Sequence, residues 1–232
     1  MLPTHTVHAK QAQFDDQGFV LVDEVLDAHE TANVLEHLHG MNLGGAGSRH
    51  LLAHDWCKEL AARLAAKPLL HELIPTTHAA VQCSYFRKSL DQNWLVAWHR
   101  DLSIPVAARV DHPELRGWSE KEGAVFVQAP TDLLTELIAV RLHLDDCTHE
   151  DGPLRVIPGS HSHGTIGQGP ILEQCKATGS VSCTAKAGDA LVIHPLLLHA
   201  SSKATGQSER RVLHFLFGPT SLPFGLQWAY LP

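Results

Sequence analysis

The stretch Ala139-Val140-Arg141-Leu142-His143-Leu144-Asp145 alternates between mostly polar odd positions and apolar even positions. A period of two is typical of a β-strand whose faces meet different surroundings, because successive side chains point to opposite sides of a sheet. The stretch belongs to a series of short apolar runs after Pro75, separated by Gly, Pro and Asp. The predicted strands cover residues 80–86, 94–99, 124–127, 137–144, 154–157, 181–185, 190–193 and 212–217. Such a series predicts a mainly β fold, a jelly roll or cupin-like double sheet.

The N-terminal third of the chain has a helical pattern instead. Asp27 and Glu30 have the spacing of a capping box, which predicts that a helix begins there. Two more helices are predicted over residues 55–66 and 68–73, the second opening on a proline. These helices are expected to flank the double sheet as an N-terminal helical layer.

The organisation that follows is a single domain over residues 1–232. Residues 1–78 are expected to form mostly helical support, and residues 79–232 the jelly-roll core. Two long connections, 103–123 and 161–179, interrupt the predicted strands. Connections of this length are either lids and binding loops or plain surface segments, and the sequence favours neither.

The composition excludes several classes of partner. The chain carries a formal net charge of −7 and contains no cluster of Lys and Arg. Binding to nucleic acid or to an anionic membrane surface requires concentrated positive charge. We therefore expect a small-molecule or protein partner, with no nucleic acid and no membrane.

The cysteines and the N-terminus bear on location. An odd number of cysteines without Cys-x-x-Cys spacing fits reduced thiols better than a disulfide framework. The polar residues 1–10 lack the apolar run of a signal peptide, and no run of about 18 apolar residues could span a bilayer. The prediction is a cytoplasmic protein. The cysteines are Cys57, Cys83, Cys147, Cys175 and Cys183.

His99 and Asp101 lie two positions apart, and His199 follows one hundred positions after His99. In an extended strand, residues i and i+2 point to the same side, so His99 and Asp101 can hold one ion. Two imidazole nitrogens and one carboxylate oxygen form the facial triad of non-haem Fe(II) oxygenases, which leaves coordination positions open. We interpret His99, Asp101 and His199 as ligands of one metal.

Other histidines compete for this role, because the chain has eighteen of them. His143 and Asp145 repeat the His-x-Asp spacing, and His194 lies five positions before His199. The proline after His194 and the Ala-Ser that follows His199 favour His199 as the third ligand. His194 is therefore expected to be structural or to lie behind the ligands.

Several motifs together resemble one family. The chain is similar to the phytanoyl-CoA dioxygenase family, a branch of the Fe(II)/2-oxoglutarate-dependent oxygenases with the double-stranded β-helix fold. The matching segments are Phe14-Asp15-Asp16-Gln17-Gly18-Phe19, Trp98-His99-Arg100-Asp101, Asp151-Gly152-Pro153-Leu154-Arg155-Val156-Ile157-Pro158-Gly159-Ser160-His161, and Gly188-Asp189-Ala190-Leu191 running into His199-Ala200-Ser201.

The resemblance implies that the three predicted ligands bind iron, with 2-oxoglutarate as cosubstrate and dioxygen as oxidant. It also implies that an arginine about eleven residues beyond the last ligand binds the distal carboxylate of 2-oxoglutarate. Arg210 is at this position, although Arg211 is adjacent and only one of the two can face the site. Ser201 and Lys88 match family positions near the same cosubstrate.

The substrate side is less defined. Arg141 and His143 are expected either to line a substrate pocket, favouring a polar or anionic group, or to face solvent. Arg155 stands where many relatives have an aromatic or aliphatic residue, and we predict a substrate contact for it. The resulting hypothesis is an Fe(II)- and 2-oxoglutarate-dependent dioxygenase that hydroxylates a small molecule. The alternatives are a cupin-like isomerase or hydrolase, or a catalytically silent binding protein, with the same metal site.

Overall fold

The computed structural model describes residues 4–41, 43, 47–163 and 179–231. The helices are α1 (Thr4–Gln17), α2 (Ala28–His39), α3 (Asp55–Ala66), α4 (Pro68–His71) and α5 (Thr131–Glu136), with short 3₁₀ turns at Leu51–Ala53, His149–Asp151 and Ser160–His163. The strands are β1 (Phe19–Val22), β2 (Gly47–Ser48), β3 (His78–Lys88), β4 (Val96–His99), β5 (Ser103–Val106), β6 (Arg116–Lys121), β7 (Ala124–Gln128), β8 (Ile138–His143), β9 (Leu154–Val156), β10 (Val181–Cys183), β11 (Ala190–Ile193), β12 (His199–Ser201) and β13 (Arg210–Pro219).

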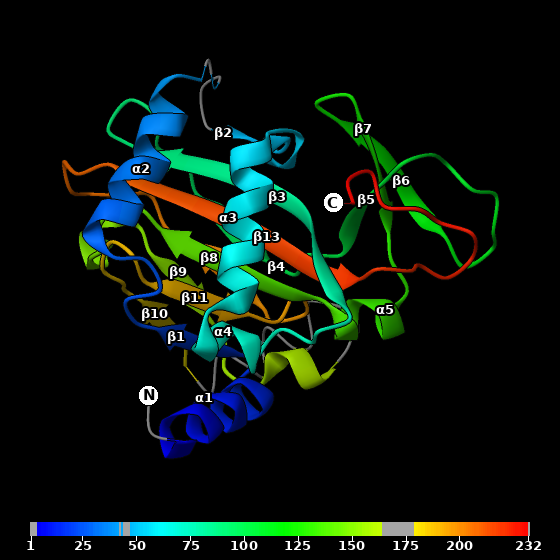
Figure 1. Ribbon diagram of the computed structural model, residues 1–232, viewed down its shortest axis with the longest axis horizontal. Helices are drawn as coiled ribbons and strands as arrows, with labels where there is room; N and C mark the ends of the chain where they lie inside the picture. Colours follow the sequence, from blue (N-terminus) through cyan, green and yellow to red (C-terminus); the bar gives the residue numbers. More distant parts are fainter. Residues whose placement is uncertain (1–3, 42, 44–46, 164–178, 232) are drawn as a thin grey trace.

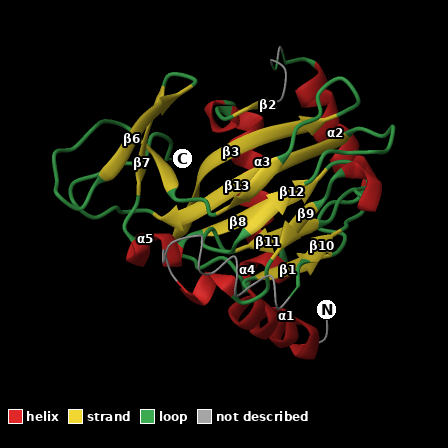
Figure 2. Ribbon diagram, turned by 180° about the vertical axis from the view of Figure 1, so that it is seen from behind, coloured by secondary structure: helices red, strands yellow, loops and turns green. Residues whose placement is uncertain are grey.

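Two antiparallel sheets form the jelly roll (Figures 1 and 2). The main sheet has six strands in the order β1-β11-β8-β13-β3-β2, and the minor sheet has four in the order β10-β9-β12-β4. Figure 2 shows the minor sheet in front of the main sheet when the molecule is seen from behind. Apolar side chains fill the space between the sheets, among them Val156 from the minor sheet and Leu191 from the main sheet.

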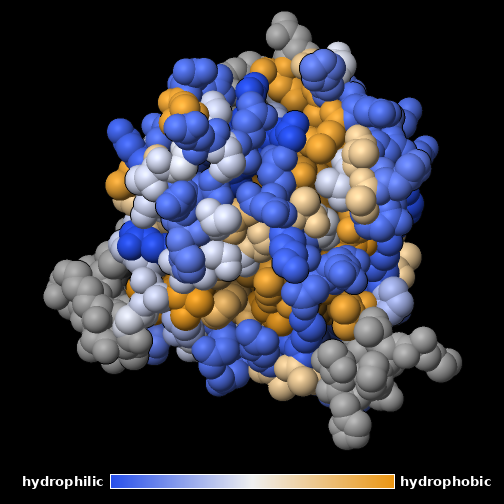
Figure 3. Space-filling view, turned by 90° about the vertical axis from the view of Figure 1, so that its left-hand side faces the viewer, coloured by the Kyte–Doolittle hydropathy of each residue, from blue (hydrophilic) through white to orange (hydrophobic). Residues whose placement is uncertain are grey.

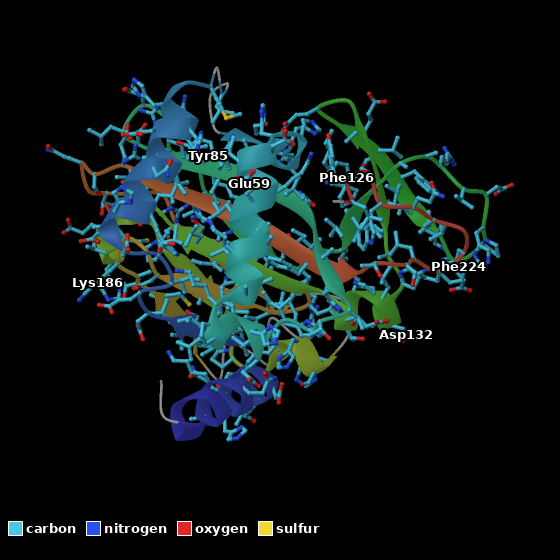
Figure 4. The ribbon with its side chains drawn as sticks, in the orientation of Figure 1. Glu59, Tyr85, Phe126, Asp132, Lys186 and Phe224 are labelled. Carbon is cyan, nitrogen blue, oxygen red and sulfur yellow. The ribbon has the colours of Figure 1, made fainter. Side chains whose placement is uncertain are left out.

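Helices α2 and α3 cover the outer face of the main sheet (Figure 1). The capping box predicted for α2 is present, since Glu30 N donates to Asp27 Oδ1 and Asp27 N donates to Glu30 Oε2. Figure 4 places Tyr85 of β3 beside these helices. The predicted helical layer is therefore observed, but the N-terminal region also supplies β1, which pairs with β11 as an edge strand of the main sheet.

Strand β8 shows why the alternation in its sequence matters. All six of its residues are buried. Val140 and Leu142 pack in the cluster beneath the helices, whereas Arg141 and His143 point to the opposite face, between the sheets. The alternative of a solvent-facing strand is therefore wrong.

A third sheet corrects the prediction for residues 103–123. That segment was expected to be a long connection, but it contributes β5 and β6, which pair on either side of β7. Pro105 lies in β5, an edge strand where a missing backbone donor is tolerated, and β6 is largely exposed and polar. The proline in β5 and the charged residues in β6 interrupt the apolar pattern from which strands are predicted, so neither strand was predicted. Most of the other predicted connection, 161–179, lies outside the described residues.

The face of the molecule drawn in Figure 3 carries both polar and apolar side chains. Figure 3 shows a mainly hydrophilic face, with hydrophobic side chains in scattered patches. In the described part of the chain, no helix is both long enough and apolar enough to cross a membrane.

Candidate functional site

His99, Asp101 and His199 come together at one end of the minor sheet. His99 ends β4 and His199 begins β12, and the two residues are paired across the antiparallel strands. The Nε2 atoms of His99 and His199 lie 3.7 and 3.6 Å from the two carboxylate oxygens of Asp101. One ligand atom from each residue lies within 4.8 Å of the other two. The three side chains therefore form a His-Asp-His metal site.

Backbone carbonyls orient both imidazole rings. His99 Nδ1 lies 2.8 Å from the carbonyl oxygen of Ala97, and His199 Nδ1 lies 2.8 Å from that of Leu197. A carbonyl oxygen can only accept, so each Nδ1 carries the hydrogen and each Nε2 keeps a free lone pair. This arrangement is typical of metal-binding histidines, whose second nitrogen is fixed by a hydrogen bond.

The protonation states of Asp101 and His199 also suit a metal. Burial raises the pKa of Asp101, but the nearby imidazoles, His199 first, outweigh it, and the pKa lies below its usual value. Burial lowers the pKa of His199 despite the attraction of Asp101. An ionised carboxylate and neutral imidazoles are the forms that coordinate divalent iron.

A cavity of about 420 Å³ opens onto the metal site. Both sheets and the three-stranded sheet contribute to its wall. Figure 4 shows Phe126 on the side of the three-stranded sheet that faces the main sheet. The residues that line the cavity are Arg49, Gln82, Ser84, Phe86, Trp94, Val96, His99, Arg100, Asp101, Leu102, Ser103, Lys121, Phe126, Arg141, Leu154, His199, Ser201, Arg210, His214 and Leu216.

Arg210 and Lys88 form a buried cationic group on the main sheet. They are partners in the register of β13 and β3, and both side chains are almost fully buried. The Lys88 ammonium donates to Ser201 Oγ and to the carbonyl oxygen of Ser202, each over 2.6 Å. Burial lowers the pKa of Lys88 to about 7, and the positive charge of Arg210 adds to the shift.

Gly152 connects this group to the loop before β9. Its carbonyl oxygen accepts hydrogen bonds from Ser201 Oγ, over 3.0 Å, and from Arg210 Nη1. Gly152 has φ +61°, and a Cβ there would lie 2.4 Å from the carbonyl oxygen of Ser202. A glycine is therefore required for this close approach of two chain segments.

The two adjacent arginines point to opposite faces of β13. Arg210 lines the cavity. Arg211 makes a forked ion pair with Asp145, in which Nε and Nη2 donate over 2.8 and 2.6 Å. The ion pair also occupies Asp145, so the rival His143-Asp145 metal pair does not form a site.

The structure brings some predicted substrate residues to the cavity and not others. Arg141 lines it, whereas His143 is buried behind the wall with both ring nitrogens unpartnered. Arg155 is absent from the wall because Leu154, its neighbour in β9, points inward. The Arg155 guanidinium lies 5.2 Å from the centre of the Trp98 ring instead. The substrate contact predicted for Arg155 therefore has no support from the cavity wall and stays a prediction.

His194 has a structural role in this structure. Its Nε2 lies 3.2 Å from the carbonyl oxygen of Thr135, and its Nδ1 accepts from the backbone N–H of Leu196 over 3.3 Å. Both ring nitrogens are therefore used by the backbone, which leaves no lone pair for a metal.

His214 and Lys121 are among the cavity residues that were not predicted from the sequence. His214 Nε2 lies 3.9 Å from Asp101 Oδ2, and burial, with Arg141, lowers its pKa to about 3. His214 lies four positions after Arg210 in one strand, so alternation places both side chains on the same face. Lys121 gave no such signal, because its strand was not expected.

Solved structures resemble this chain over nearly its whole length. The epimerase SnoN from nogalamycin biosynthesis, in complex with Fe³⁺, alpha ketoglutarate and nogalamycin RO, has a TM-score of 0.71 at 18% identity, covering 99% of this chain and 91% of SnoN. HygX from Streptomyces hygroscopicus, with nickel and 2-oxoglutarate bound, has a TM-score of 0.61 at 18% identity, covering 95% and 88%. EctD from S. alaskensis has a TM-score of 0.65 at 17% identity, covering 97% and 81%. These likenesses confirm the predicted fold.

Sequence comparison gives the family. L-proline trans-4-hydroxylase from Streptomyces griseoviridis is 25% identical over 190 residues, which cover 69% of this chain and 63% of that protein. The chain therefore spans less than two thirds of that relative's length. The family description "Phytanoyl-CoA dioxygenase (PhyH)" matches residues 14–212. With this match and the His-Asp-His site in its cavity, the chain belongs to the phytanoyl-CoA dioxygenase family.

Proposed function

We propose that the protein is an Fe(II)- and 2-oxoglutarate-dependent dioxygenase that hydroxylates a small molecule with a polar or anionic group. One observation carries the proposal: the predicted metal ligands and the buried Arg210 face the same cavity from opposite sheets. A metal on one wall and a guanidinium on the other suit a cosubstrate with a chelating end and a distal carboxylate.

Within this proposal, His99, Asp101 and His199 hold the iron, and Arg210 binds the distal carboxylate of 2-oxoglutarate. Lys88 and Ser201 lie beside Arg210 and add a cation and a hydroxyl to the same end. Bound iron would supply the activation of dioxygen and the oxidative decarboxylation of 2-oxoglutarate. The remaining work belongs to the chain, which orients both molecules and excludes water.

Hydroxylation is favoured over other outcomes of this chemistry by the curated relative, which is a proline hydroxylase. The structural relatives include an epimerase as well, so the metal site alone does not select the outcome. We also propose that residues 1–232 act as one oxygenase domain. A cytoplasmic location is supported by Cys57, Cys83, Cys147 and Cys183, which are all buried and unbridged.

The test is an anaerobic titration of the Fe(II)-loaded protein with 2-oxoglutarate, followed by the weak visible charge-transfer band of a chelated keto acid. We expect the band in the wild type, its loss in His199→Ala, and at least tenfold weaker 2-oxoglutarate binding in Arg210→Ala. His143→Ala is the matched control and keeps the band. A wild-type protein with full iron occupancy and no band would contradict the proposal, favouring a non-oxygenase cupin or a binding protein.

A further inference from the structure

Arg141 is a buried guanidinium with no acidic partner. Only 7% of the residue is exposed, and among the described residues it makes no ion pair, although the more distant Asp101 carboxylate attracts it. Its Nη1 donates to His214 Nδ1 over 3.2 Å, its Nε has no partner, and its Cζ lies 5.7 Å from the centre of the Phe86 ring. A buried cation without an ion-pair partner is costly, so this guanidinium favours the binding of an anion beside it.

Lys121 is a second free cation in the same cavity. It ends β6, and its Nζ lies 4.7 Å from the centre of the Phe126 ring. The neighbouring acid, Glu122, is occupied by Arg49, whose backbone N–H and Nη1 donate to it over 2.8 and 2.5 Å. The Arg49–Glu122 pair therefore fixes the turn between β6 and β7, and Glu122 is not available to neutralise Lys121.

The charges of the cavity wall do not balance. Asp101 is its only acidic residue among those described, and the metal requires that carboxylate. Arg100 is bound to the backbone carbonyl oxygens of Leu196 and Ser160. With Arg210 assigned to the cosubstrate, Arg141 and Lys121 are the cations left over. An excess of positive charge in a recessed site concentrates anions.

We propose that Arg141 and Lys121 together bind a carboxylate of the primary substrate, which is therefore a small carboxylic acid. The proposal rests on the function proposed above, since it assigns Arg210 to 2-oxoglutarate. A planar guanidinium can donate two parallel hydrogen bonds to a carboxylate, and an ammonium adds a point charge. The cavity of about 420 Å³ must hold cosubstrate and substrate together, so the acid is small.

The test uses acetate and acetamide, which have the same shape and differ in charge. The protein is loaded with Zn(II) and saturating 2-oxoglutarate, so that the cosubstrate site is filled, and binding is followed by saturation-transfer NMR. We expect binding of acetate but not of acetamide. Arg141→Gln and Lys121→Gln should each weaken acetate binding at least tenfold. Equal binding of acetamide, no binding of acetate, or undiminished binding in Lys121→Gln would overturn the proposal.

Each of two control variants removes a cation that lies over an aromatic ring outside the cavity. Arg155 lies over Trp98, and Arg109 lies with its Cζ 5.4 Å from the centre of the Trp118 ring. Arg155→Gln and Arg109→Gln should therefore bind acetate as the wild type does. Loss of acetate binding in these controls would show a general effect of surface charge and would overturn the assignment.

The 2-oxoglutarate titration in the same variants separates this proposal from the function on which it rests. Arg141→Gln should keep the affinity for 2-oxoglutarate within about threefold, which also shows that the variant is folded. If Arg141→Gln lost 2-oxoglutarate binding as Arg210→Ala does, Arg141 would be a cosubstrate residue and only this proposal would fail. Absence of the band in the wild type would instead contradict the proposed function.

Discussion

Lys88 and Arg210 are cross-strand partners on the main sheet with buried positive charges; Arg210 lines the cavity, and Lys88 donates to Ser201 in its wall. Two like charges in a buried place repel each other and are poorly solvated. The pair therefore favours the binding of an anion, and in its absence Lys88 loses its proton more easily than an exposed lysine does. Binding of the anion and protonation of Lys88 are thereby coupled.

The affinity for 2-oxoglutarate should fall as the pH rises. Burial, with Arg210 and Arg141, lowers the pKa of Lys88 to about 7, so the ammonium is present below pH 7 and is lost above it in the free protein. The carboxylates of 2-oxoglutarate stay ionised across this range, since their usual pKa values are about 4. We expect up to about a tenfold loss per pH unit above 7. Titrations between pH 6 and pH 9 measure this, and a slope that persists in Lys88→Gln would refute the assignment.

The adjacent arginines provide a matched pair. Arg210→Gln should weaken 2-oxoglutarate binding about 10- to 100-fold, since a charged hydrogen bond contributes about 1.5–3 kcal/mol. Arg211→Gln removes the ion pairs with Asp145 and Glu209 on the other face, and it should leave that affinity unchanged while costing about 1 kcal/mol of stability. Calorimetric titration and urea unfolding measure the two effects. If Arg211→Gln weakened 2-oxoglutarate binding more than Arg210→Gln does, Arg211 would be the residue that binds the distal carboxylate.

Gly152→Ala should damage both stability and cosubstrate binding. The added Cβ would lie 2.4 Å from the carbonyl oxygen of Ser202 at a φ of +61°, with an expected cost of about 1–3 kcal/mol. Relief of this clash would shift the Gly152 carbonyl oxygen, which accepts hydrogen bonds from Arg210 and Ser201. Gly123→Ala is the control, because Gly123 has φ +80° and nothing within 4 Å of an added Cβ. Equal 2-oxoglutarate affinity in both variants would show that the Gly152 carbonyl does not position the site.

Metal binding should stabilise the fold. His99, Asp101 and His199 come from two separated segments, so an ion on them binds the folded chain and not the unfolded one. At 100 times the dissociation constant, the gain is about 2.7 kcal/mol, and a chelator should remove it. Asp101→Asn should abolish the metal-dependent rise in Tm, whereas the exposed control Asp111→Asn should retain it. A rise of equal size in Asp101→Asn would place the metal elsewhere.

Much of the fold was predictable because its signals are local. The alternation around Arg141 and the capping box at Asp27 and Glu30 each depend on a few neighbouring residues, and both are observed. The family and the fold are confirmed by the comparisons, and the three predicted metal ligands lie together in the structure. The substrate roles of Arg141 and His143 stay predictions.

What could not be predicted from the sequence depends on tertiary context. Nothing in the sequence around Arg155 shows which face of its short strand meets the cavity, and the family position alone suggested a substrate contact. The edge strand with Pro105 and the polar strand that ends at Lys121 lack the apolar pattern of a buried strand. Their partner, β7, is what defines them, so Lys121 could not be placed in the cavity from the sequence.

The three-stranded sheet has a consequence for how such proteins diversify. It contributes Lys121 and Phe126 to the cavity wall, whereas the metal ligands and Arg210 belong to the jelly roll. Under the proposed function, mutations in this sheet would therefore change which molecule is accepted while leaving the metal ligands and Arg210 in place. An evolving lineage could exchange substrates through this appendage, and a laboratory library aimed at new acids would best be concentrated in residues 103–128.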